Sequence, residues 1–145
     1  MSSSLELGAI RLSLILDAET TIGGNEVFHP ASPEEWSPGL NPDVAGNLAV
    51  SVNALLISEG DEHTLVDTGF GEETPADLPA RTSTVLAGLA RLGIGPRQIR
   101  RVIITHAHDD HCLGNTVQRA GRWLPAFPAA EYVVQEREVA FLREA

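Results

Sequence analysis

A short run of residues in the second half of the sequence has the composition of a metal site. Three imidazoles and a carboxylate fall within six positions, at His106, His108, Asp110 and His111. Neutral imidazole and carboxylate are ligands that suit Zn²⁺ and its neighbours Fe, Mn and Co. Three of the five histidines of the chain lie in this run, so a chance grouping explains it poorly. The run therefore predicts a metal centre.

The spacing within the run indicates two metal positions. Residues two apart on a strand share a face, so His106 and His108 can converge on one metal where a strand ends. Asp110 and His111 lie further around the following turn and can hold a second ion. Two ions about 3.5–4 Å apart can clamp a hydroxide and polarise a carbonyl or phosphoryl oxygen. The predicted chemistry is metal-assisted hydrolysis.

The elements that must position this run can be predicted from the hydrophobic pattern. Apolar alternation, or a short continuous apolar run between turn residues, predicts strands over 9–16, 48–58, 64–66, 99–104 and 131–134. Helical spacing of apolar residues predicts helices over 82–92 and 136–145. The strand over 99–104 leads directly into the ligand run, and its continuous apolar residues suit a sheet covered on both faces.

Residues 20–47 are rich in turn-forming residues and predict a long loop. They contain four of the nine prolines and the adjacent Gly23 and Gly24. Long loops in compact domains are often functional, so Phe28 and Trp36 could line a substrate mouth. The favoured alternative is that the two rings only pack the loop against the body of the protein.

Two stretches of this sequence resemble the metallo-β-lactamase superfamily. Residues 105–111, Thr-His-Ala-His-Asp-Asp-His, match its T-H-x-H-x-D-H signature. Residues 65–69, Leu-Val-Asp-Thr-Gly, are similar to the upstream strand of that superfamily that ends in D-T-G. The order of the two stretches along the chain also agrees.

The resemblance implies a role for each residue of the site. His106 and His108 would bind the first metal, and Asp110 and His111 the second, with two zinc ions expected and Fe, Mn or Co as alternatives. Asp110 is also the candidate catalytic residue. Asp67 would steady the ligand loop, as carboxylates behind metal-binding imidazoles do. For Asp67, a plain turn-capping role is an equally open alternative.

The resemblance also implies a fold, of which this chain would form the first half. Superfamily members are α/β (α+β) proteins built as a four-layer αβ/βα sandwich, a mixed sheet with flanking helices in each half, and the resemblance spans residues 9–145. Members complete the site with a histidine, a bridging aspartate and a last histidine downstream, whereas no His or Asp follows His111 here. We therefore expect a single partial domain over 1–145, truncated at its C-terminus and weakly active alone.

A later segment points to one branch of the superfamily. Residues 127–134, Phe-Pro-Ala-Ala-Glu-Tyr-Val-Val, are similar to the F-P-x-A strand entry of acyl-homoserine lactonases and organophosphate hydrolases. This implies a hydrolase in which a metal-activated hydroxide attacks an ester, lactone or related bond of a small molecule. Two alternatives stay open: an iron-dependent oxidoreductase of the sulfur-dioxygenase kind, and a non-catalytic fragment or interaction remnant.

Charge and composition bear on partners and compartment. A net charge of −10 without a Lys or Arg cluster argues against nucleic-acid binding. The longest apolar stretch, 48–57, is shorter than the ~18 residues of a membrane span. Cys112, the single cysteine, fits a reducing cytoplasm and is expected to be a packing residue rather than a metal ligand. A missing half would uncover an apolar face, which predicts self-association.

Overall fold

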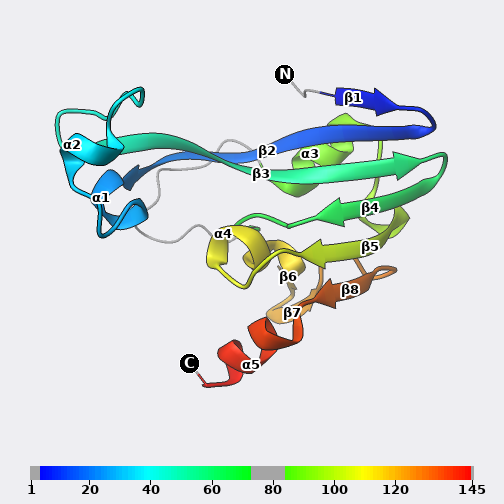
Figure 1. The fold of residues 1–145 in the computed structure, drawn as a ribbon. Helices are drawn as coiled ribbons and strands as arrows, with labels where there is room; N and C mark the ends of the chain where they lie inside the picture. The colour runs from blue at the N-terminus through cyan, green and yellow to red at the C-terminus, as the bar shows by residue number, and fades with distance from the viewer. Residues whose placement is uncertain (1–3, 73–83, 145) are drawn as a thin grey trace. The chain divides into compact units, whose positions relative to one another are not determined.

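The computed structural model describes residues 4–72 and 84–144, and shows the expected mixed α/β architecture (Figure 1). The strands are β1 (Ser4–Leu7), β2 (Ile10–Gly23), β3 (Asn47–Glu59), β4 (Glu62–Val66), β5 (Ile99–Ile104), β6 (Thr116–Arg119), β7 (Arg122–Pro125) and β8 (Glu131–Val134). The helices are α1 (Gly24–Val27), α2 (Pro33–Trp36), α3 (Val85–Arg91), α4 (Asp109–Cys112) and α5 (Glu136–Glu144), with 3₁₀ turns η1 (Pro96–Gln98) and η2 (Leu113–Asn115).

Six strands form one mixed sheet in the order β1-β2-β3-β4-β5-β8. The pairs β1–β2 and β3–β4 are antiparallel, because each is joined by a tight turn. The pairs β4–β5 and β5–β8 are parallel, and the segment that connects β4 to β5 contains α3. The ends of β4 and β5 therefore lie at the same edge of the sheet, where α4 follows β5 (Figure 1).

The chain divides into two compact units, a larger one of residues 1–18 and 52–145 and a smaller one of residues 19–51. The core of the larger unit joins the sheet to α3 and to the segment before β8. Its most deeply buried apolar side chains are Leu56, Leu65, Leu89, Ile99, Val102 and Phe127. Burial of such side chains is the main favourable contribution to folding, at roughly 1.5–3 kcal/mol each.

Helix α3 lies close against β2 because a glycine faces the strand. A Cβ added at Gly88 would overlap the Ile15 side chain. The N-terminus of the helix is held by Asp17, whose Oδ1 accepts from the Val85 N–H at 3.0 Å. Asp17 Oδ2 accepts from the Phe70 N–H at 3.0 Å, so this buried carboxylate joins α3 to the segment that follows β4.

The structure corrects two boundaries predicted from the sequence. Strand β2 runs to Gly23 instead of ending before Asp17, because the backbone N–H donors around Asp17 allow a carboxylate to be buried within the strand. Residues 20–47 are not a plain loop, since they contain the end of β2 and both α1 and α2. The predicted helix over 82–92 is observed as α3, and its first residues lie outside the described part of the chain.

The aromatic residues of the smaller unit pack against each other. The rings of Phe28 and Trp36 stack with centroids 5.6 Å apart, and Trp36 Nε1 donates to Asn25 Oδ1 at 3.0 Å. The Trp36 ring also lies over Gly24, where a Cβ would overlap it. Within this unit the rings therefore pack on each other and on Gly24, and the prediction that they pack the loop against the body of the protein stays a prediction.

The hairpin of β6 and β7 has no counterpart in the sequence prediction, because its strands are short and mostly exposed. The strands predicted over 48–58, 64–66, 99–104 and 131–134 and the last helix are confirmed within one or two residues. Within residues 4–72 and 84–144, the longest apolar helix is too short to cross a bilayer.

Candidate metal centre

The parallel pairing of β4 and β5 brings two loops of the sequence together. Val66 pairs with Ile103, so Asp67 and Thr105 both leave the sheet at the same edge. The Asp67 N–H donates to the Ile103 carbonyl at 2.8 Å, which extends the pairing by one more residue. The chain then turns through residues 106–108 into the single turn of α4, which returns His111 toward Asp67.

The Asp67 carboxylate binds both ends of the ligand run. Its Oδ1 accepts from the Thr105 N–H at 2.8 Å, and its Oδ2 accepts from the Thr105 hydroxyl at 2.8 Å. The same Oδ2 lies 2.7 Å from His111 Nδ1. Asp67 is almost fully buried and has a φ of 60°, a left-handed conformation that Asp tolerates better than most residues. The carboxylate thus positions both the loop that begins at Thr105 and the turn of α4 that carries His111.

The three imidazoles of the run lie next to one another. The His106 and His111 ring centroids are 3.9 Å apart, and those of His106 and His108 are 4.6 Å apart. His106 Nε2 lies 3.1 Å from His108 Nδ1, and Asp110 Oδ2 lies 3.3 Å from His111 Nε2. All four predicted ligands are therefore gathered at the edge where β4 and β5 end.

These donors are paired with one another rather than aimed at a common point. His106 faces His108, while Asp67 and Asp110 face the two ring nitrogens of His111. Accordingly, no group of three or more His, Cys, Asp or Glu side chains in the described ranges is already arranged to hold an ion. The donor types and their proximity fit a metal. Rotation about side-chain bonds, without movement of the sheet, would redirect the imidazoles.

The backbone of the ligand run is also held from outside. The Ala107 N–H, between the first two histidines, donates to Glu138 Oε2 on α5 at 2.9 Å. The His111 carbonyl accepts from the Thr68 N–H at 2.8 Å, so the end of the run is bound to the segment after β4. Gly114 makes this approach possible, because a Cβ there would overlap the Thr68 carbonyl oxygen.

Cys112 follows the run and packs inward. Its side chain is partly buried and lies against the main apolar cluster. Burial raises the pKa of the Cys112 thiol, and the Asp109, Asp110 and Asp67 carboxylates raise it further. The neutral thiol is therefore favoured, which agrees with the packing role expected from the sequence.

Several residues of this arrangement were not assigned a role from the sequence. Thr105 is the first residue of the motif over 105–111, and that position is the only local sign of its role in the site. Glu138 and Asp17 carried no local signal, because each acts through a contact with a residue more than thirty positions away. His29 lies in the smaller unit, and His63 lies at the start of β4, the opposite end of that strand from Asp67.

Comparison with known families gives this arrangement a context. The family model described as the metallo-beta-lactamase superfamily matches residues 48–145, which include Asp67 and the whole ligand run. The chain belongs to the metallo-beta-lactamase superfamily. The resemblance seen in residues 105–111 and 65–69 is thereby confirmed.

Solved structures of other proteins share this fold. A "probable metal-dependent hydrolase" from Staphylococcus aureus is 24% identical with a TM-score of 0.80, over 97% of this chain and 52% of that chain. AidC, a dizinc quorum-quenching lactonase in complex with a product, is 24% identical with a TM-score of 0.78, over 99% of this chain and 48% of that one. The hydrolase AbOPH is 22% identical with a TM-score of 0.75, over 97% of this chain and 46% of that chain.

The chain covers only part of each of these structures. The chain spans about half the length of the three proteins it matches. Its mixed sheet with flanking helices agrees with the expected half of the sandwich.

Proposed function

We propose that this chain carries the first part of a dinuclear metal-dependent hydrolase site. His106 and His108 would hold one metal ion, and Asp110 and His111 the other. The observation that carries the proposal is the gathering of these four side chains beside the buried Asp67 carboxylate, in a chain of the metallo-beta-lactamase superfamily. Zinc is the proposed ion, and Fe, Mn or Co suit the same donors.

Asp67 supports this assignment because its carboxylate contacts Nδ1 of His111. Asp67 Oδ2 lies 2.7 Å from His111 Nδ1, so the carboxylate favours a proton on that nitrogen. The lone pair of His111 Nε2 is then available to bind a metal ion. Asp110 lies 3.3 Å from Nε2 and would turn toward the same ion. The Thr105 hydroxyl and backbone keep the carboxylate from rotating. Asp67 thus acts as a positioning residue for the metal ligands.

The proposed chemistry is hydrolysis of an ester, lactone or related bond in a small molecule. Bound metal ions would supply Lewis acidity and lower the pKa of a water molecule. Asp110, at the edge of the group and more than a third exposed, is the proposed catalytic carboxylate. The lactone preference rests on the Phe-Pro-Ala-Ala segment that enters β8, and similarity to a dizinc lactonase is consistent with it. The hydrolases among the similar structures do not favour the iron-dependent alternative.

The chain alone supplies two ligands for each ion, whereas a catalytic zinc usually has three. We therefore expect weak metal binding and little turnover from these 145 residues by themselves. The proposed full activity belongs to a protein in which further ligands complete the site.

A titration with Co²⁺, followed by visible absorption, tests the proposal. We expect ligand-field bands that His106→Ala and His111→Ala each weaken, while His29→Ala, outside the run, leaves them unchanged. Zn²⁺ should displace the Co²⁺ signal. Bands that persist in both His106→Ala and His111→Ala, or that are lost in His29→Ala, would show that the ions bind outside residues 105–111.

Hydrolysis is measured separately from binding. N-hexanoyl-homoserine lactone and 4-nitrophenyl acetate serve as probes, with and without added Zn²⁺. Zinc-dependent turnover that disappears in Asp110→Asn supports the proposed chemistry. A zinc-dependent rate that Asp110→Asn leaves unchanged would contradict the proposed role of Asp110.

The proposed cellular compartment is the cytoplasm.

Self-association of the chain is a further expectation. Exposed apolar side chains on β8 and α5, such as Val133, Phe141 and Leu142, are the surface on which that expectation rests. Light scattering over a range of protein concentrations tests it, and a strictly monomeric chain would contradict it.

A further inference from the structure

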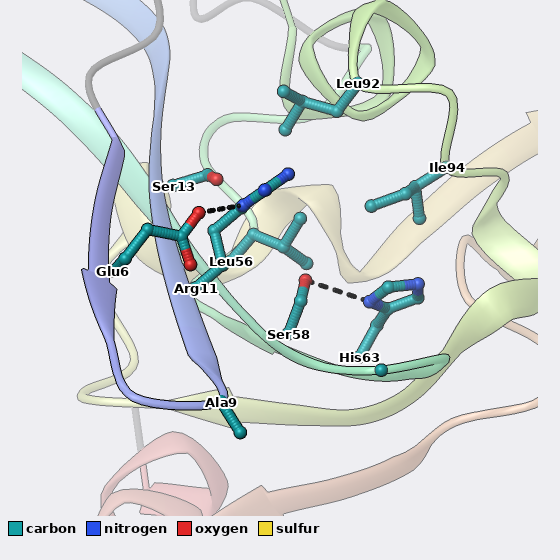
Figure 2. A pocket seen from close by; sticks show the side chains of 10 residues that line it. Glu6, Ala9, Arg11, Ser13, Leu56, Ser58, His63, Leu92 and Ile94 are labelled. Atoms are coloured by element: carbon teal, nitrogen blue, oxygen red, sulfur yellow. Dashed lines mark hydrogen bonds and ion pairs between the residues drawn. The ribbon is translucent and has the colours of Figure 1, made fainter.

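A separate pocket opens at the other end of the sheet from the ligand run. It has a volume of about 420 Å³ and lies in the larger unit, between the β1–β2 and β3–β4 hairpins and the segment after α3 (Figure 2). His63 lines it at the start of β4, whereas Asp67 follows the end of the same strand. A volume of this size is within the range of small-molecule sites, roughly 300–1,000 Å³.

The pocket exists because α3 covers only part of the sheet face. Ile15 packs under Gly88 of the helix, and Ser13, two residues earlier on β2, points to the same face. The helix ends at Arg91, so Ser13 lies beyond its cover. Along this face the side chains change from apolar under the helix to polar in the pocket, where Arg11, Ser58 and His63 join Ser13.

Arg11 presents hydrogen-bond donors to the pocket. Its Nε donates to Glu6 Oε1 at 2.6 Å, and the side chains of this pair are 63% and 58% exposed. The two terminal nitrogens have no hydrogen-bond partner among the described residues. Figure 2 shows this end of the side chain directed away from Glu6, toward Leu92. Two parallel N–H donors of this kind match the two oxygens of a carboxylate.

Two nearly buried polar side chains also face the pocket. His63 is 8% exposed, and its Nδ1 lies 2.9 Å from Ser58 Oγ. If the Ser58 hydroxyl donates to Nδ1, the neutral ring carries its proton at Nε2, which has no partner among the described residues. Ser13 is 3% exposed, and its hydroxyl likewise lacks a partner in the described ranges. No buried side-chain nitrogen or oxygen of the described residues lacks a partner. The Ser13 hydroxyl and His63 Nε2 therefore reach the solvent of the pocket, where a ligand oxygen can take the place of water.

The rest of the wall is apolar. Leu56 of β3 lines the pocket, and so do Leu92 and Ile94 from the segment after α3 (Figure 2). From these features we propose that the pocket binds a small carboxylate with a short aliphatic chain. The carboxylate pairs with the Arg11 guanidinium and accepts from the Ser13 hydroxyl and His63 Nε2, while the chain lies against Leu56, Leu92 and Ile94.

Titration with sodium hexanoate, followed by ¹H–¹⁵N correlation spectra in the presence of EDTA, tests this site. EDTA removes metal, so a carboxylate cannot bind at the ligand run through an ion. We expect saturable shifts at the amides of Ser13, Ser58 and His63. Hexan-1-ol, which keeps the chain and lacks the charge, should bind at least about tenfold more weakly, as expected for loss of a charge-assisted hydrogen bond.

Variants locate the interaction. Arg11→Gln should weaken hexanoate binding about tenfold, and Ser13→Ala should weaken it severalfold without adding volume. Arg122→Gln, at an exposed arginine in the β6–β7 hairpin, is the matched control and should bind as the original chain does. The absence of saturable shifts, equal binding of hexanol, unchanged binding by Arg11→Gln, or shifts confined to residues 105–111 would each overturn the proposal.

Discussion

Asp67 and His111 lie 44 residues apart in the sequence, yet Asp67 Oδ2 is 2.7 Å from His111 Nδ1. The same carboxylate accepts two hydrogen bonds from Thr105, at the opposite end of the ligand run. One buried side chain therefore determines where the run begins and how its last imidazole is turned. This relationship explains why an aspartate is placed directly after β4, in a left-handed conformation.

Replacement of Asp67 by Asn should weaken metal binding while the fold is kept. Asparagine tolerates the left-handed backbone and can still accept from the Thr105 N–H, but it loses the charge that orients His111. Loss of such a partner typically costs 10–100-fold in metal affinity. Competition between the chain and a chromogenic zinc chelator measures the change. Asp61→Asn, in the exposed β3–β4 turn, is the control, and equal affinities in the two variants would refute the role of Asp67.

Glu138 should control the order of the loop between His106 and His108. Removing its carboxylate in Glu138→Ala leaves the Ala107 N–H without its acceptor, so hydrogen exchange at that amide should accelerate about five- to tenfold, the equivalent of one ordinary hydrogen bond. Glu138→Gln retains an acceptor oxygen and should restore most of the protection. Glu144→Ala, an exposed residue of α5, serves as the control. If the Ala107 amide exchanges at the same rate in Glu138→Ala and Glu138→Gln, the hydrogen bond does not hold the loop.

Gly114 should be intolerant of a side chain. In Gly114→Ala the added Cβ would overlap the Thr68 carbonyl oxygen, which forces apart the segments after β4 and after α4. We expect a loss of unfolding free energy of about 2 kcal/mol or more, the range of severe steric substitutions. Thermal unfolding measures it. Gly95→Ala is a suitable control because a Cβ there meets only the Gln98 side chain at 3.5 Å, and its unfolding midpoint should stay near that of the original chain.

Tyr132 gives a pH dependence that can be followed directly, because it is the only tyrosine. Burial raises the pKa of its phenol, whose oxygen donates to the Asn115 carbonyl at 3.2 Å and accepts from the Phe127 N–H at 3.2 Å. Absorbance at 295 nm should therefore show ionisation above the ordinary value of about 10.

The same shift has a consequence for stability. The folded chain holds the phenolic proton more tightly than the unfolded chain, so this contribution is complete below pH ~10 and is lost as the pH rises through the raised pKa. Tyr132→Phe should remove that alkaline dependence and cost about 1–2 kcal/mol for the two hydrogen bonds. An ionisation midpoint at or below the ordinary value would contradict the prediction.

The ligand run and the elements around it could be predicted from the sequence because their signals are local. His106, His108, Asp110 and His111 stand close along the chain, so a turn of any shape keeps them within reach of one another. Strands β4, β5 and β8 and helix α5 follow from the period of their apolar residues, which depends on backbone geometry over a few residues. Superfamily membership followed from the same short stretches.

The contacts that hold the site together depended on the tertiary structure. Asp67 meets His111, and Glu138 meets Ala107, only because β4, β5 and β8 are neighbours in one sheet. The sequence predicts that a strand ends before Asp17, whereas the N–H groups of Phe70 and Val85 bind its oxygens and the strand continues through it. Such pairings have no period along the chain. They arise from the packing of the whole core, which decides which distant residues share one place.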